Sequence, residues 1–184
     1  MLLILKKNFL IKVPLNVSVF LKKKKNFILI KGPLGSRYLK VNLDIIFLSQ
    51  KHSVYLENRQ KVFNQNKKFE GLIYKLKKFI LEVSSVLTKK LKFLGLGYRF
   101  FLIDKSLDLL ELRLGYSHKI FFKPPKLISI YCNKNTLLYL KSSNYNFLSE
   151  VSAFIRSYRM PEPYKGKGIL YLNEKISLKK GKKI

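Results

Sequence analysis

Several residue types are scarce in this sequence, and each scarcity excludes a class of protein. The 184 residues include no tryptophan, a single cysteine, Cys132, and two histidines, His52 and His118. A lone cysteine cannot form an intrachain disulfide, and no Cys or carboxylate stands near either histidine at the spacing of metal ligands. We therefore expect no disulfide, no metal and no cofactor, and the chain is compatible with a reducing compartment.

Negative charge is scarce as well. Ten Asp and Glu residues are set against 38 Lys and Arg residues, which leaves a formal net charge of +28. Such an excess calls for a polyanionic partner, usually nucleic acid or an anionic membrane surface. The chain is nevertheless 47% hydrophobic and 14% aromatic, unlike a disordered basic tail. Composition therefore predicts a folded protein that binds nucleic acid, with a membrane surface as the alternative.

Long apolar runs and catalytic patterns are missing too. No 18-residue apolar window exists, so we expect no membrane insertion. The stripe from Leu72 to Leu87 comes nearest to a membrane-surface helix, but a protein core explains it better. A nuclease would need a carboxylate or histidine cluster, and the acids are scattered. Gly95-Leu96-Gly97 lacks the third glycine of a dinucleotide fingerprint and is interpreted as part of a strand with a bare face. We predict that the protein is not an enzyme.

Hydrophobic periodicity gives the first half of the chain a sheet and a helix. Residues 27–31 and 37–43 alternate around Gly32-Pro33-Leu34-Gly35 as in a hairpin, and residues 53–56 form another strand. The apolar residues from Leu72 to Leu87 then recur at helical spacing. A helix packed on a sheet is the expected result.

The second half repeats this plan. Its helix is expected over residues 147–158, with Asn146 as the N-cap, Glu150 in the first turn, and Arg156 and Arg159 near the C-terminus. The apolar stripe of that helix consists of Phe147, Val151, Phe154, Ile155 and Tyr158. Strands are expected at 91–102, 110–114, 119–122, 127–132 and 136–141.

The repeated order predicts an α+β fold of two similar small domains from an internal duplication, with an offset of roughly eighty residues. Each domain is a mostly antiparallel sheet packed with an amphipathic helix. The expected boundaries are 1–84 and 85–172, followed by a basic tail at 173–184.

The most informative segment is Arg159-Met160-Pro161-Glu162-Pro163-Tyr164-Lys165-Gly166-Lys167-Gly168-Ile169. Its prolines fix φ and should end the preceding helix. Its last two glycines should let a flexible loop approach a partner closely, while a tyrosine offers a stacking face and two lysines offer charge. The segment is therefore predicted to lie against phosphates.

Four motifs in order carry a resemblance: Thr88-Lys89-Lys90-Leu91, Gly95-Leu96-Gly97-Tyr98-Arg99, Leu114-Gly115-Tyr116-Ser117-His118 and the segment from Arg159 to Ile169. With them the chain resembles the bacterial-type family of large-subunit ribosomal protein L6, strongly over about residues 82–183 and weakly before them. The resemblance implies the duplicated α+β fold. It also implies binding to large-subunit rRNA, chiefly through residues 85–172, near the sarcin–ricin loop and the stalk base.

The same resemblance implies protein partners: neighbouring large-subunit ribosomal proteins near the stalk base, and translational GTPases that dock transiently. An AT-rich coding bias, with alanine only at Ala153, and the lack of a presequence point to a mitochondrial ribosome and an organelle-encoded protein. A plastid or an AT-rich bacterial cytoplasm is the alternative.

The expected mechanism is structural binding that reads RNA shape more than sequence, through cations and close backbone loops. The tail from Ile176 to Ile184 should order when it meets RNA, whereas the Lys22–Lys25 run is interpreted as a solvated turn. The predicted RNA-binding residues are Lys89, Lys90, Gly97, Tyr98, Arg99, Ser117, His118, Arg156, Arg159, Tyr164, Lys165, Gly166, Lys167, Gly168, Lys179, Lys180, Lys182 and Lys183.

Overall fold

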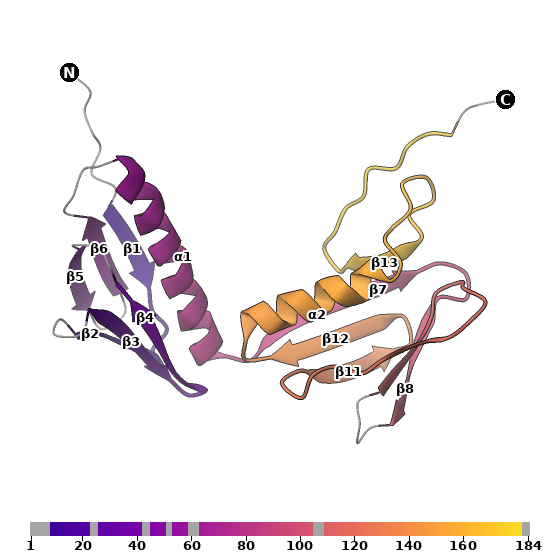
Figure 1. Ribbon diagram of the computed structural model, residues 1–184, viewed down its shortest axis with the longest axis horizontal. Helices are drawn as coiled ribbons and strands as arrows, with labels where there is room; N and C mark the ends of the chain where they lie inside the picture. The colour runs from indigo at the N-terminus through magenta and orange to yellow at the C-terminus, as the bar shows by residue number, and fades with distance from the viewer. Residues whose placement is uncertain are drawn as a thin grey trace. The chain divides into compact units, whose positions relative to one another are not determined.

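The computed structural model describes residues 8–22, 26–41, 45–50, 53–58, 63–104 and 109–181. The chain divides into two compact units, Met1–Val86 (unit 1) and Leu87–Ile184 (unit 2) (Figure 1). All strand pairs among the described residues are antiparallel. The predicted α+β class is therefore confirmed.

Unit 1 consists of two three-stranded sheets and one helix around a single core. The strand orders are β1-β6-β5 and β2-β3-β4. Strands β1, β2 and β5 were not predicted from the sequence. The bounds are β1 Asn8–Lys12, β2 Ser18–Lys22, β3 Phe27–Gly32, β4 Gly35–Lys40, β5 Ile45–Gln50, β6 Ser53–Asn58 and α1 Phe63–Ser84.

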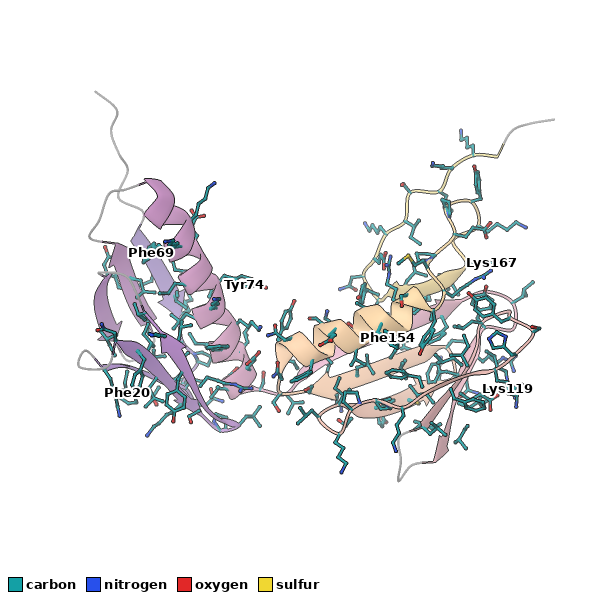
Figure 2. All side chains as sticks on the ribbon, in the orientation of Figure 1. Phe20, Phe69, Tyr74, Lys119, Phe154 and Lys167 are labelled. Atoms are coloured by element: carbon teal, nitrogen blue, oxygen red, sulfur yellow. The ribbon has the colours of Figure 1, made fainter. Side chains whose placement is uncertain are left out.

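Helix α1 buries one face, as its periodicity predicted. Phe69 and Leu76 are buried in the core, whereas Tyr74 on another side of the helix is exposed (Figure 2). The predicted stripe ran on to Leu87, and this was wrong, because α1 ends at Ser84 and Leu87 opens the next strand.

The end of α1 is fixed by hydrogen bonds from two turns of unit 1. The Leu34 amide donates to the Val83 carbonyl oxygen over 3.2 Å, and the Asn16 side-chain amide donates to the Ser84 carbonyl oxygen over 3.3 Å. The last carbonyls of a helix lack partners within it. These donors satisfy two of them and stop the helix before Leu87.

Unit 2 repeats the topology of unit 1 and adds one strand. The strand order β7-β12-β11 repeats β1-β6-β5, and β8-β9-β10 repeats β2-β3-β4. In each unit the helix follows these strands in the chain, α1 after β6 and α2 after β12. Strand β13 pairs with the free edge of β7. The shared topology supports the predicted duplication. The bounds are β7 Leu87–Leu94, β8 Arg99–Asp104, β9 Leu109–Arg113, β10 Ile120–Phe122, β11 Ser129–Lys134, β12 Leu137–Ser142, α2 Tyr145–Ser157 and β13 Gly168–Tyr171.

Helix α2 begins two residues earlier than the sequence suggested. Its N-cap is Asn144, whose side-chain oxygen accepts a hydrogen bond from the Asn146 amide over 3.0 Å. The prediction of Asn146 as N-cap was therefore wrong, and Glu150 lies beyond the first turn. Asn144 is the N-cap because its backbone is extended, with φ −101° and ψ 114°, as an N-cap requires.

The buried face of α2 is also rotated from the predicted one. Phe147 and Phe154 remain 39% and 51% exposed, and Leu148 is buried in their place. The Phe154 ring lies over Phe122 and Tyr158 at the margin of the core. The side chains of α2 that are buried against β7, β12 and β13 are Leu148, Val151, Ser152 and Ile155.

Candidate nucleic-acid interface

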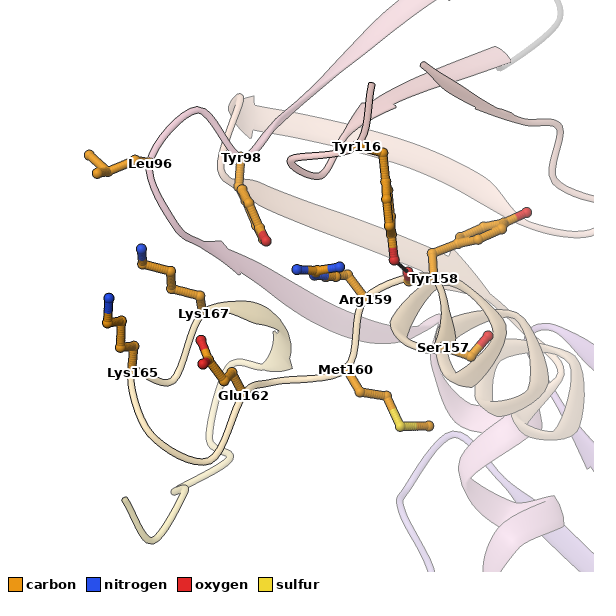
Figure 3. A pocket seen from close by; sticks show the side chains of 10 residues that line it. All are labelled: Leu96, Tyr98, Tyr116, Ser157, Tyr158, Arg159, Met160, Glu162, Lys165 and Lys167. Carbon is orange, nitrogen blue, oxygen red and sulfur yellow. Dashed lines mark hydrogen bonds between the residues drawn. The ribbon is translucent and has the colours of Figure 1, made fainter. Parts of the chain in front are cut away.

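Three segments that are distant in the sequence line one open groove of about 680 Å³ in unit 2 (Figure 3). They are the turn between β7 and β8, the loop that follows β9 and the segment that follows α2. These segments carry three of the four motifs singled out in the sequence, so the fold brings the motifs together. The groove is lined by Leu96, Tyr98, Tyr116, Ser157, Tyr158, Arg159, Met160, Glu162, Lys165 and Lys167.

Arg159 is the cation at the centre of this groove. Its guanidinium carbon lies 5.0 Å from the centre of the Tyr116 ring, and the Tyr116 hydroxyl donates to the Tyr158 carbonyl oxygen over 2.9 Å (Figure 3). The hydroxyl oxygens of Tyr116 and then Tyr98 raise the pKa of Arg159 further above its ordinary value. The His118 ring stacks on Tyr116 at 5.9 Å between ring centroids. A permanent positive charge is thus held in one place.

Tyr98 fills the space between two glycines. The predicted strand 91–102 breaks into β7 and β8 here, and Gly95 has φ +147°. A Cβ on Gly95 would lie 2.9 Å from the Tyr98 ring, and one on Gly115 would lie 3.0 Å from it. The interpretation of Gly95 and Gly97 as strand glycines with a bare face was therefore wrong. Tyr98 is 7% exposed and turns its hydroxyl toward Arg159 (Figure 3).

The segment after α2 is a closed loop rather than an open one. The Glu162 amide donates to the Lys167 carbonyl oxygen, and the Gly166 amide donates to the Glu162 carbonyl oxygen, both over 2.9 Å. The side chain of Lys165 is exposed at the tip and that of Lys167 is half-buried beside it. The prediction of a flexible loop missed these backbone hydrogen bonds, which hold both lysines at the groove.

Gly168 serves the fold of this segment. It is the first residue of β13, with φ +148°, and a Cβ there would lie 2.6 Å from Pro161 Cα. The close approach predicted for Gly168 is made by the chain's own backbone.

Comparison with known proteins identifies the family. The family model for ribosomal protein L6 matches residues 104–172. The large ribosomal subunit protein uL6 of Karelsulcia muelleri (strain GWSS) is 39% identical, over 90% of this chain and 91% of that protein. The uL6 protein of Mycoplasmoides gallisepticum is 40% identical, over 95% of this chain and 94% of that protein. The chain belongs to the ribosomal protein L6 family. A third relative in the family, uL6 of Parabacteroides distasonis, is 36% identical over 94% of this chain.

The C-terminal tail of this L6-family chain runs along residues 162–167, the closed loop after α2, which we call the groove loop. The Lys179 amide donates to the Pro163 carbonyl oxygen over 2.9 Å, and the Leu178 side chain lies 3.4 Å from where a Cβ on Gly166 would be. Lys179 and Lys180 are exposed. Lys182 and Lys183 lie outside the described residues, as do Lys23–Lys25 of the lysine run.

Lys89 and Lys90 of the first L6 motif lie on opposite faces of β7, because side chains alternate along a strand. The ammonium of Lys89 lies on the α2 side, 5.5 Å from the Tyr145 ring centre and 5.3 Å from that of Tyr171. Lys90 is exposed on the other face, 5.2 Å from the ring centre of Tyr139. The two ammonium groups therefore lie on opposite faces of the sheet and do not bind the same stretch of RNA backbone.

Arg156 is occupied within the chain. Its Nε donates to Glu174 Oε2 over 3.2 Å, and its guanidinium carbon lies 5.7 Å from the Tyr171 ring centre. The hydrogen bond from Arg156 is the main cause of the lowered pKa of Glu174. Arg156 thus joins β13 and the tail to α2, apart from the groove lining.

The other predicted residues are exposed. Arg99 opens β8, Ser117 and His118 follow Tyr116, and Tyr164 is 55% exposed on the groove loop. Gly97 lies in the turn with φ +76° and open space around it. Sequence reasoning missed Tyr116, Leu96 and Met160 as lining residues, although all three stand inside quoted motifs.

Within the described ranges, no helix is long and apolar enough to cross a membrane. The same part of the chain holds no group of three or more His, Cys, Asp or Glu residues placed to bind a metal ion. Cys132 is half-buried, and burial raises the pKa of its thiol to about 11.

Proposed function

We propose that this protein is a structural constituent of the large ribosomal subunit that binds large-subunit rRNA through unit 2. Its site on the rRNA is near the sarcin–ricin loop and the stalk base, where it supports the docking of translational GTPases. One observation carries the proposal: three family motifs meet at a groove whose cations are Arg159, Lys165 and Lys167. Proteins of this kind hold RNA through phosphates and shape.

The groove suits RNA by its chemistry. The Arg159 guanidinium offers a forked set of donors, which matches phosphate oxygens. Leu96 and Met160 are 90% and 62% exposed at its edge and can cover a ribose or a base edge. A-form RNA displays 2′-hydroxyls and phosphates across a shallow minor groove. We infer that the groove straddles such a surface and that Tyr164 packs beside it.

The partners and compartment belong to the same proposal. Neighbouring ribosomal proteins near the stalk base contact the protein, and translational GTPases meet it transiently. The relatives named above come from bacteria. A ribosome of an AT-rich bacterium therefore agrees with these relatives. The mitochondrial assignment comes from the sequence, and a plastid or an AT-rich bacterial cytoplasm is its alternative.

Crosslinking tests the proposal directly. We would irradiate cells or organelles with ultraviolet light, isolate the protein and map both the crosslinked peptides and the attached RNA. Crosslinks from residues 156–168 to one region of large-subunit rRNA near the sarcin–ricin loop are the expected result. Crosslinks scattered over many RNAs, or none in this segment, would contradict it.

A further inference from the structure

A second basic surface lies on unit 2, on the face of the β11-β12-β7-β13 sheet that α2 does not cover. The register pairs Lys90 with Tyr139, and Tyr139 in turn with Tyr131. Paired residues share a face, and so do residues two apart on one strand. Lys92 and Lys141 therefore join them. We call these five residues the lysine–tyrosine face: Lys90, Lys92, Tyr131, Tyr139 and Lys141.

Cations and rings alternate across this face. The ammonium of Lys90 lies 5.2 Å from the Tyr139 ring centre, and that of Lys141 lies 5.2 Å from the Tyr131 ring centre. The two rings meet edge to face at 6.1 Å. Each ring thus holds a lysine down on the sheet and reduces the side-chain entropy that binding would cost.

The charge of this face is uncompensated by its own strands. The four strands of the sheet, β7, β11, β12 and β13, contain no Asp or Glu. Lys90 and Lys92 are exposed, and Tyr131 is 54% exposed. A sheet face with three cations at strand spacing attracts a polyanion.

The duplicated fold supplies an internal comparison. The corresponding face of unit 1 lies on β1 and β6, where Leu10 pairs with Tyr55 and Lys12 pairs with Ser53. Leu10 is 62% exposed there, and Lys12 is the one lysine of those two strands. A lysine-rich coding bias acts on both units alike. The basic face is therefore a property of unit 2.

We propose that the lysine–tyrosine face is a second RNA contact, which binds the sugar–phosphate backbone of an RNA helix other than the one in the groove. The proposal rests on the ribosomal role proposed above and shares no residue with the groove lining. Lysines already lie over both tyrosine rings, so stacking of unpaired bases would have to displace them. Phosphates, in contrast, meet the ammonium groups where they stand.

A charge-matched pair of variants tests the contact. The first changes Lys90, Lys92 and Lys141 to Gln; the control changes Lys67, Lys68 and Lys75 to Gln, which are exposed on α1 in unit 1. Binding to a large-subunit rRNA fragment is measured across salt concentrations, and thermal unfolding checks the fold. We expect the negative slope of log K against log salt to become shallower by about 2 to 3 in the first variant only, at about 0.7 to 0.9 for each phosphate. Equal slopes in the two variants would overturn the proposal.

Site-specific crosslinking separates this inference from the proposed function. A photo-reactive amino acid replaces Tyr131 in one protein and Tyr164 in another, and each is incorporated into large subunits. We expect both to crosslink rRNA, at different nucleotides. RNA crosslinks from Tyr164 alone, or protein crosslinks from Tyr131, would overturn the second contact and leave the groove. RNA crosslinks from Tyr131 alone would overturn RNA binding at the groove and leave the second contact. RNA crosslinks from neither position would overturn both proposals.

Discussion

Arg159 lies with its guanidinium carbon 5.0 Å from the centre of the Tyr116 ring. Arg159 follows α2, and Tyr116 stands in the loop after β9, where its hydroxyl bonds back to the Tyr158 carbonyl oxygen over 2.9 Å. The ring therefore fixes both the end of the helix and the position of the cation. RNA binding through the groove should depend on this uncharged side chain.

Replacing Tyr116 by Leu removes the ring under Arg159 and should weaken binding to the rRNA fragment about 2- to 5-fold, since an exposed cation–π contact contributes about 0.5 to 1 kcal/mol. Tyr116 is 41% exposed, so the fold should survive. Tyr116→Phe keeps the ring and loses only the hydrogen bond, and it should retain more affinity than the Leu variant. Filter binding at fixed salt measures both. Wild-type affinity in Tyr116→Leu would contradict the role of the ring.

The two lysines of the groove loop should act through charge. Changing Lys165 and Lys167 to Gln should make the negative slope of log K against log salt shallower by roughly 1.4 to 1.8, at about 0.7 to 0.9 for each phosphate contact. Lys67→Gln with Lys68→Gln on α1 removes the same charge from unit 1 and should leave the slope as it is. An unchanged slope in the loop variant would place both lysines outside the interface.

The fold was largely predictable because its signals are local. The alternation of apolar residues in the strands and their helical spacing in α1 predict which residues are buried. The repeated order of elements predicts the duplication. The exact helix ends were not predictable, because two turns decide where α1 stops and the backbone of Asn144 decides where α2 begins. Tertiary contacts therefore decide the helix ends, because the neighbouring residues have similar helix propensities.

The candidate site was predictable in its motifs and only partly in its mechanism. Gly95 and Gly115 are 20 positions apart in the sequence, and only the fold shows that both make room for Tyr98. Likewise, the sequence gives Arg156 and Arg159 the same charge, whereas the structure pairs one with Glu174 and sets the other over Tyr116. Which cation is available to RNA depends on contacts with residues far along the chain.

Gly168 should be sensitive to the smallest side chain. Gly168→Ala adds a Cβ at 2.6 Å from Pro161 Cα at φ +148°, and backbone strain with overpacking should reduce the free energy of unfolding by about 3 kcal/mol or more. Gly97→Ala, at φ +76° with nothing within 4 Å, should cost only about 1 to 2 kcal/mol. Urea unfolding of the free protein compares them. Equal losses of unfolding free energy in the two variants would show that the backbone at Pro161 shifts at little cost to make room for the added Cβ.

The ion pair between Glu174 and Arg156 should make stability depend on pH. The pKa of Glu174 is lowered in the folded protein, first by the Arg156 hydrogen bond, whereas an unfolded glutamate titrates near about 4.3. The pair therefore stabilises the fold above that pH, and its contribution is lost as the pH falls through the folded pKa. Glu174→Gln should be less stable than wild type at pH about 7, by about 1 kcal/mol or less for a pair of this exposure.

The difference between the two proteins should shrink as the pH falls below about 4, because wild-type Glu174 then carries a proton and resembles the Gln variant. Urea unfolding at a series of pH values follows this convergence. Glu150→Gln, on the exposed side of α2, serves as the control for the loss of one carboxylate from a highly basic protein. A Glu174→Gln difference that stays constant from neutral to acid pH would mean that packing of the side chain, and not its charge, joins the tail to α2.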